Sequence, residues 1–100
     1  MQMHPTTCLT IVAEAVVEQR LLHDLQASGA RGWTITPGTG RGSALVGPSE
    51  WAGPNVRVET LVSRRVADRI LEVLDRDYFP YYSVVAWVSE VRVVRPERFG

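Results

Sequence analysis

The sequence predicts an α+β domain of the ferredoxin-like kind, in which a four-stranded antiparallel sheet carries two helices on one face. Alternating apolar and β-branched residues, typical of strands, occur at 7–13, 33–36, 56–62 and 84–94. Amphipathic stretches, with apolar residues three or four apart, follow the first and third of these strands. The resulting order, βαββαβ, is that of a split-βαβ fold, and 100 residues suffice for one such domain.

Local signals support each element in turn. In the first strand, Leu9, Ile11 and Ala13 alternate with polar or β-branched residues. The first helix is expected to end at Ser28-Gly29, because this pair commonly terminates helices. Ser63 is a suitable N-cap for the second helix, which is expected to end near residue 76. The expected buried stripes of the two helices are Val17, Leu21, Leu22 and Leu25, and Val66, Ile70, Val73 and Leu74.

The final strand is apolar on both faces over its first half. Its apolar residues fall on two sides, Val85, Trp87, Val91 and Val93 on one and Val84, Ala86 and Val88 on the other. Because both helices cover the same face of the sheet, the second apolar face must be exposed or must contact another chain. We therefore expect a homo-oligomer packed sheet against sheet, with Trp87 in a core position.

Composition excludes several function classes. Acidic and basic residues balance at 11 each, so no overall positive field attracts nucleic acid. Every basic residue is an arginine, which excludes the lysine-dependent Walker A phosphate loop. Cys8 is the only cysteine, and His4 and His23 are too few and too far apart for a zinc cluster, so we expect no metal site. Neither a signal peptide nor a membrane-spanning run is evident, and the expected location is the cytoplasm.

A long glycine-rich loop is expected between the second and third strands, from Pro37 to Pro54. Five of the eight glycines lie there, and a loop of this length is usually functional or disordered. Within it, the run 40–43 (Gly-Arg-Gly-Ser) offers backbone N–H groups and a guanidinium to a phosphate or a smaller oxyanion. The same run is also compatible with a plain flexible connection. Arg95 and Arg98 form either a second anion clamp that converges with the loop or a solvated tail.

The sequence offers little for catalysis. Ser43, His23 and Asp24 do not form a readable triad. Glu14 and Glu18 lie four apart and indicate a solvated face of the first helix rather than an acid–base pair. The aromatic residues around Pro80 are expected to pack under the end of the second helix; these are Tyr78, Phe79, Tyr81 and Tyr82. We therefore expect a binding module and not an enzyme.

Two segments carry a family resemblance. The run from Leu25 to Ile35, followed by the Gly-Arg-Gly-Ser of 40–43, resembles the PII signal-transduction superfamily. In that family the same helix end leads through a short strand into a Gly-x-Gly segment that opens the long T-loop. The run 55–59 is similar to the strand after the T-loop, and the strand through Arg95 resembles the arginine-bearing C-terminal strand. The Gly-Arg-Gly-Ser run and the tail 95–99 are similar to those of PII-like members associated with carboxysomes and bicarbonate transport.

The resemblance implies a homotrimer in which residues 1–100 form one PII-like domain with a T-loop at about 37–54. The implied function is non-enzymatic sensing of adenine nucleotides at inter-subunit clefts, with no resident cofactor. The resemblance also implies bicarbonate as a second effector, for which Arg41, Gly42 and Ser43 are the expected site. The T-loop would signal to a partner protein in inorganic-carbon metabolism, such as a bicarbonate transporter or a carboxysome component. The nucleotide-binding residues so implied are Gly32, Trp33, Thr34, Gly40, Arg41, Gly42, Ser43, Leu61, Val62, Arg95 and Arg98.

Departures from the family pattern restrict which ligands the protein is expected to bind. Ala44 stands near the position of a glutamine that helps hold 2-oxoglutarate, and Asn55 stands near that of a lysine. The segment between Arg76 and Val84 is too short for the B-loop that cradles triphosphates, which favours ADP or AMP over ATP. Two other classes stay open, a ferredoxin-like trimer that handles divalent cations and a slow nucleotidase. The lack of a cysteine or histidine cluster argues against the cation-handling trimer. The lack of a base to activate water argues against the nucleotidase.

Overall fold

The computed structural model describes residues 1–40 and 53–95 as one layer of helices on one sheet. A short 3-10 helix, η1, links the first strand to the first α-helix. The elements in chain order are β1 (His4–Glu14), η1 (Ala15–Val17), α1 (Glu18–Ala27), β2 (Thr34–Gly40), β3 (Gly53–Val62), α2 (Arg64–Asp77) and β4 (Val84–Val93).

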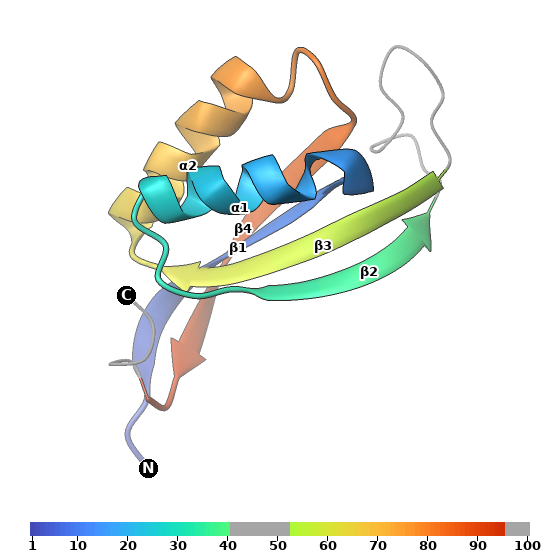
Figure 1. Cartoon of the computed structure of the whole chain (residues 1–100). Coiled ribbons are helices and arrows are strands. Elements are labelled where there is room, and N and C mark those ends of the chain that lie inside the picture. Colours follow the sequence, from blue (N-terminus) through green and yellow to red (C-terminus); the bar gives the residue numbers. More distant parts are fainter. Residues whose placement is uncertain (41–52, 96–100) are drawn as a thin grey trace.

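The sheet has the order β2-β3-β1-β4, with each neighbouring pair antiparallel. Both α-helices lie on the same face of it (Figure 1). The predicted ferredoxin-like arrangement of four strands and two helices is therefore confirmed. The opposite face carries no helix in the described part of the chain, and we refer to it as the open face of the sheet.

The core lies between the helices and the sheet. Leu9, Ile11 and Ala13 of the central strand β1 are fully buried, as their alternation predicts. The stripe of α1 is also confirmed, because Leu21 and Leu25 are buried against them. The other buried core residues are Val17, Ala30, Val56, Val58, Val62, Ala67, Ile70, Leu74 and Tyr78.

The helix ends have the local chemistry that the sequence indicates. Gly29 has φ +114°, a left-handed conformation that favours glycine, and it terminates α1. Ser63 is the N-cap of α2, since its Oγ accepts a hydrogen bond of 3.2 Å from the backbone N–H of Val66. In the described ranges, neither α1 nor α2 is long and apolar enough to cross a membrane.

The strands on either side of the predicted loop are longer than expected. Residues 37–40 continue β2 instead of opening a loop, and Gly53 to Asn55 begin β3. The two segments pair, with Pro37 opposite Val56 and Gly40 opposite Gly53. Glycine and proline are intrinsically poor strand formers. At these positions the pairing with β3 outweighs their low strand propensity. The remainder of the predicted loop, 41–52, lies outside the described residues.

Strands β1 and β4 extend beyond the rest of the sheet. β3 ends at Val62, opposite Thr7 of β1, so residues 4–6 pair only with β4. The result is a two-stranded ribbon that extends away from the helices (Figure 1). This ribbon carries the C-terminal end of β4, and with it Arg95, away from the other strands.

Removing the α2 cap should destabilise the domain. Ser63→Ala deprives the Val66 N–H of its acceptor and should lower the free energy of unfolding by about 1 kcal/mol. Ser63→Asp retains an acceptor and places a negative charge beside the helix N-terminus, so its stability should stay near that of the parent. Urea denaturation of the three proteins measures both effects. Equal stability of the alanine and parent proteins would contradict the role of the cap.

Candidate functional site

One group of predicted site residues meets at the ends of β2 and β3. Thr34, the first residue of β2, pairs with Glu59 of β3. The Thr60 hydroxyl donates a 2.7 Å hydrogen bond to the carbonyl of Gly32, which fixes the approach to β2. Gly32 and Thr34 are exposed, while Trp33 is half-buried and packs against the core. The structure thus places residues 32–34 beside 59–61, as a shared ligand site requires.

Leu61 and Val62 complete this group in different ways. Leu61 is half-buried and alternates with the core residues of β3, so it lies on the open face. Val62 is fully buried on the helix side, and only its backbone remains for a ligand. It lines a hollow of about 350 Å³ between α2 and the ribbon. This hollow is a separate feature from the Thr34–Leu61 group, whose open-face residues do not line it.

Two other predicted residues lie far from this group and from each other. Gly40 is at the opposite end of β2 from Thr34, paired with Gly53. Arg95 follows β4 at the tip of the ribbon, beyond the level at which β3 ends. At about 3.3 Å per strand residue, Gly40 and Arg95 are separated by on the order of 40 Å of sheet. Figure 1 shows the two strand ends at opposite ends of the molecule. Within one chain Arg95 therefore does not lie near Gly40, and a clamp between Arg95 and the loop of another subunit stays a prediction.

The remaining predicted residues lie outside the described part of the chain. They are Arg41, Gly42, Ser43 and Arg98, together with Ala44 and Trp51 of the same loop. Their roles stay predictions.

A row of four residues crosses the open face from edge to edge. Thr34 of β2 pairs with Glu59 of β3, which pairs with Thr10 of β1, which pairs with Trp87 of β4. Thr10 donates a 3.4 Å hydrogen bond to Oε2 of Glu59. Arg57 lies on the same face, two residues from Glu59 along β3. Its Nη2 is 3.7 Å from Glu59 Oε2, and its guanidinium lies 5.4 Å from the ring centroid of Trp87.

Arg57 and Glu59 are not among the site residues predicted from the sequence, and Trp87 does not have its predicted core position. Trp87 is 42% exposed in the single chain instead of lying in its core. Its strand was correctly assigned, but Trp87 lies on the face that carries no helix in the described part of the chain. The sequence did contain a pattern that places Arg57 and Glu59 together. They alternate with the valines of β3, so both lie on the outer face of the strand.

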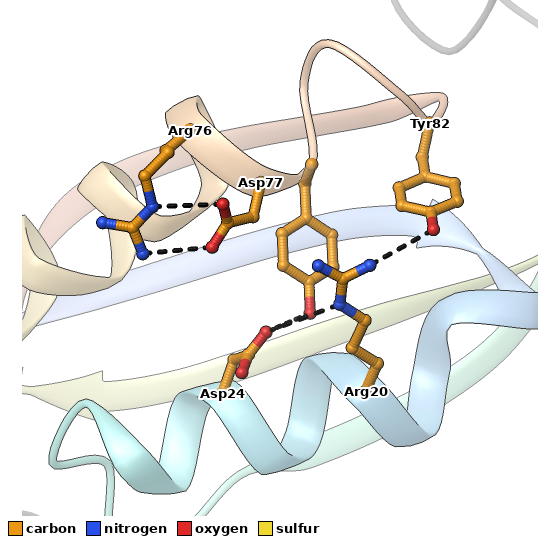
Figure 2. Close-up of polar contacts among 6 residues, drawn as sticks. Arg20, Asp24, Arg76, Asp77 and Tyr82 are labelled. Atoms are coloured by element: carbon orange, nitrogen blue, oxygen red, sulfur yellow. Dashed lines mark hydrogen bonds and ion pairs between the residues drawn. The ribbon is translucent and has the colours of Figure 1, made fainter.

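The turn between α2 and β4 is tied to α1 by side chains (Figure 2). The hydroxyl of Tyr78, which is fully buried, donates a 2.6 Å hydrogen bond to Asp24. Arg20 lies 5.0 Å from the ring centroid of Tyr78 and donates to the Tyr82 hydroxyl at 3.2 Å. Burial, followed by the bond to Asp24, raises the pKa of Tyr78 above its ordinary value. Tyr78 therefore stays protonated and acts as the donor that joins the turn to α1.

A second bond holds the other end of this turn and corrects an expectation. Glu14 is the last residue of β1, not a helix residue beside Glu18, and its carboxylate accepts a 2.7 Å bond from the N–H of Ser83. The aromatic residues of the turn divide into two groups. Tyr78 is buried as expected, whereas Phe79 and Tyr81 are exposed.

Comparison with known proteins decides the family. A family model described as nitrogen regulatory protein P-II matches residues 6–98. A protein of Thermus thermophilus described as PII-like and signalling is 46% identical over the full length of both chains, with a TM-score of 0.85. The chain belongs to the PII family. The resemblance predicted from its sequence is thereby confirmed, and the chain is a PII-like signalling protein.

Solved structures of one further relative have the same fold as this PII protein. CPII, a PII-like protein of Thiomonas intermedia K12, is 24% identical in its form bound to ADP, AMP and acetate. That structure covers 99% of this chain and 98% of its own, with a TM-score of 0.86. The form bound to ADP and bicarbonate is 23% identical, covers the same shares and has a TM-score of 0.85. Among curated proteins, no match to this PII chain was found.

The described part of this PII protein offers no grouping of three or more histidine, cysteine or acidic residues that could hold a metal ion. Its Asp24 is engaged by the Tyr78 hydroxyl rather than by a histidine. Its open face carries a carboxylate, a guanidinium and an indole in contact with one another.

Stability at high pH should depend on Tyr78. Because the pKa of Tyr78 is higher in the folded than in the unfolded protein, its contribution is complete below the unfolded value of about 10 and is lost as the pH rises further. The parent protein should therefore lose stability above about pH 10. Tyr78→Phe should be less stable at neutral pH by about 1–2 kcal/mol and should lack this part of the alkaline loss.

Thermal unfolding between pH 7 and 11.5 measures both effects. Tyr81→Phe is the matched control, because Tyr81 is 72% exposed and should leave the profile unchanged. An alkaline loss of equal size in the parent and Tyr78→Phe proteins would contradict the assignment.

Proposed function

We propose that this PII protein is a non-enzymatic, homotrimeric sensor of adenine nucleotides that favours ADP and AMP over ATP. The observation that carries the proposal is its family membership, together with the ligands of CPII, which binds ADP, AMP and bicarbonate. The proposed nucleotide residues are Gly32, Trp33, Thr34, Gly40, Arg41, Gly42, Ser43, Leu61, Val62, Arg95 and Arg98.

The separation of these residues supports a cleft between subunits. Gly40 and Arg95 lie at opposite ends of one chain, so neither can join the other at a single phosphate. In a trimer, the arginine of one subunit can approach the T-loop base of the next. The open face, with its exposed Trp87, supplies a surface for that association.

The short turn between α2 and β4 supports the preference for shorter phosphate chains. Two hydrogen bonds, Tyr78 to Asp24 and Ser83 to Glu14, tie its two ends to the body of the domain. A turn held in this way cannot fold over a triphosphate, and the chain has no lysine to supply in its place.

Bicarbonate is the proposed second effector, held by Arg41, Gly42 and Ser43 in the place that a further phosphate would take. Two ligands that share a site region affect each other's binding by the same factor, so bicarbonate and nucleotide are thermodynamically linked. We place the protein in the cytoplasm. There its T-loop signals to a partner in inorganic-carbon metabolism, such as a bicarbonate transporter or a carboxysome component.

Calorimetry tests the ligands directly. AMP and ADP should bind at submillimolar concentrations and more tightly than ATP, and bicarbonate should change the affinity for one of them. The absence of nucleotide binding near 1 mM would overturn the sensor proposal, whereas indifference to bicarbonate would remove only the second effector.

Two further measurements test the alternative functions. Steady phosphate release would indicate a nucleotidase, and a melting temperature raised by copper or zinc alone would indicate a cation-handling trimer.

A mixing experiment tests the inter-subunit cleft. Arg41→Ala and Arg95→Ala should each weaken nucleotide binding by roughly one to two decades, because each removes a charge-assisted bond to phosphate. Trimers co-assembled from the two variants should regain tight binding in some clefts, since such a cleft receives Arg41 and Arg95 from different chains. Co-assembly without recovery would contradict the inter-subunit cleft. Arg65→Ala, on the exposed face of α2, is the matched control.

A further inference from the structure

Three side chains converge on one oxygen of Glu59. Oε2 accepts from the Thr10 hydroxyl at 3.4 Å and from the Cys8 thiol at 4.0 Å, and it lies 3.7 Å from Nη2 of Arg57. Glu59 is the cross-strand partner of Thr34, a residue of the proposed nucleotide site. The carboxylate beside Thr34 is therefore oriented by groups from β1 and β3 and does not extend freely into solvent.

Of these groups, Arg57 has the longest reach. It stands on β3, whereas Trp87 stands on β4, and β1 lies between these strands. Adjacent strands are about 4.8 Å apart, so the guanidinium must extend across β1 to lie 5.4 Å from the Trp87 ring centroid. Thr10 of β1 is buried in this region. It faces the side without helices, and yet it is only 1% exposed. It lies between Glu59 and Trp87 in the row, and its hydroxyl donates to the Glu59 carboxylate.

We infer that Arg57 is a positioning residue, which holds the Glu59 carboxylate beside Thr34 and is itself held by the indole of Trp87. The Arg57–Glu59 ion pair alone could not do this, because both side chains are nearly half exposed and pairs of that kind contribute little. The contact with Trp87 favours the arrangement in which the guanidinium lies 5.4 Å from the ring centroid. In that arrangement its Nη2 is directed at Glu59 Oε2.

The inference rests on the proposed function and adds a route between subunits. Trp87 lies on the face expected to be covered in the trimer, and a cation–π contact strengthens when water is removed from it. Association of subunits would then fix Arg57 more firmly, and through it Glu59. By linkage, a nucleotide that contacts the Thr34–Glu59 end would in turn stabilise the association through Trp87.

The test measures AMP affinity by calorimetry on trimers whose mass is verified by light scattering. Arg57→Met keeps the aliphatic stem but removes both polar contacts, and it should weaken AMP binding about tenfold, the loss expected for one charge-assisted contact. Trp87→Leu removes the ring and should weaken binding about threefold to tenfold. Trp87→Phe, which restores an aromatic face, should return most of the affinity. A merely structural role for Trp87 would not distinguish Phe from Leu in this way.

Coupling between the two positions gives a second readout. The double variant Arg57→Met/Trp87→Leu should bind no more weakly than Arg57→Met alone, because the indole acts only through the guanidinium. Arg65→Met, on the exposed face of α2, is the control for loss of one positive charge. Where Arg57→Met dissociates the trimer, Arg57→Lys serves instead, since it keeps the charge but not the planar stacking group, and it should lose about threefold.

The outcomes separate the two proposals. A parent protein that binds no nucleotide overturns the proposed function itself. A parent that binds AMP, with Arg57→Met and Arg57→Lys trimers binding equally well, overturns only the role of Arg57. Additive losses in the double variant would also overturn it, because Trp87 would then act independently.

Discussion

The antiparallel pairing of β1 with both β3 and β4 is the constraint on which the site depends. It makes β3 and β4 run in the same direction, so that β4 carries Arg95 past the level at which β3 ends. The pairing of β2 with β3 sends Gly40 to the opposite end. No rotation of side chains can close the resulting distance. A phosphate site that used both ends of the chain would therefore have to be shared between chains, as in the proposed inter-subunit cleft.

The two faces of the sheet are stabilised by different means. On the helix side, fully buried aliphatic residues such as Leu9 and Ile11 pack against α1 and α2. On the open face the contacts are polar instead, and Glu59 receives them from Cys8 and Thr10 of β1 and from Arg57 of its own strand. Such a face is ordered before any partner covers it, which lowers the entropic cost of association. It also brings charged groups close to the interface.

The sequence predicted the strands, the helices and their caps, because these depend on periodicity and on single residues such as Gly29 and Ser63. The predictions from sequence were wrong where a neighbouring strand or another subunit determines the conformation or the burial of a residue. Residues 37–40 are a strand only because β3 pairs with them. Trp87 has the pattern of a core residue, and periodicity cannot tell whether the same chain or another covers it. The residues near Glu59 were missed for a related reason, since register alone places Thr34, Glu59 and Thr10 in one row.

The β2–β3 hairpin joins the two parts of the proposed site. At one end its strands meet at Gly40 and Gly53, the base of the T-loop, and at the other Thr34 pairs with Glu59. Between these ends the strands are paired without a break, so a shift imposed at one end is transmitted along a continuous hydrogen-bonded ladder. The turn before β4, tied by Tyr78 and Ser83, does not share that freedom. A ligand bound at either end of the hairpin would therefore act on the strands that lead to the proposed T-loop, while the turn before β4 stays tied to the body of the domain.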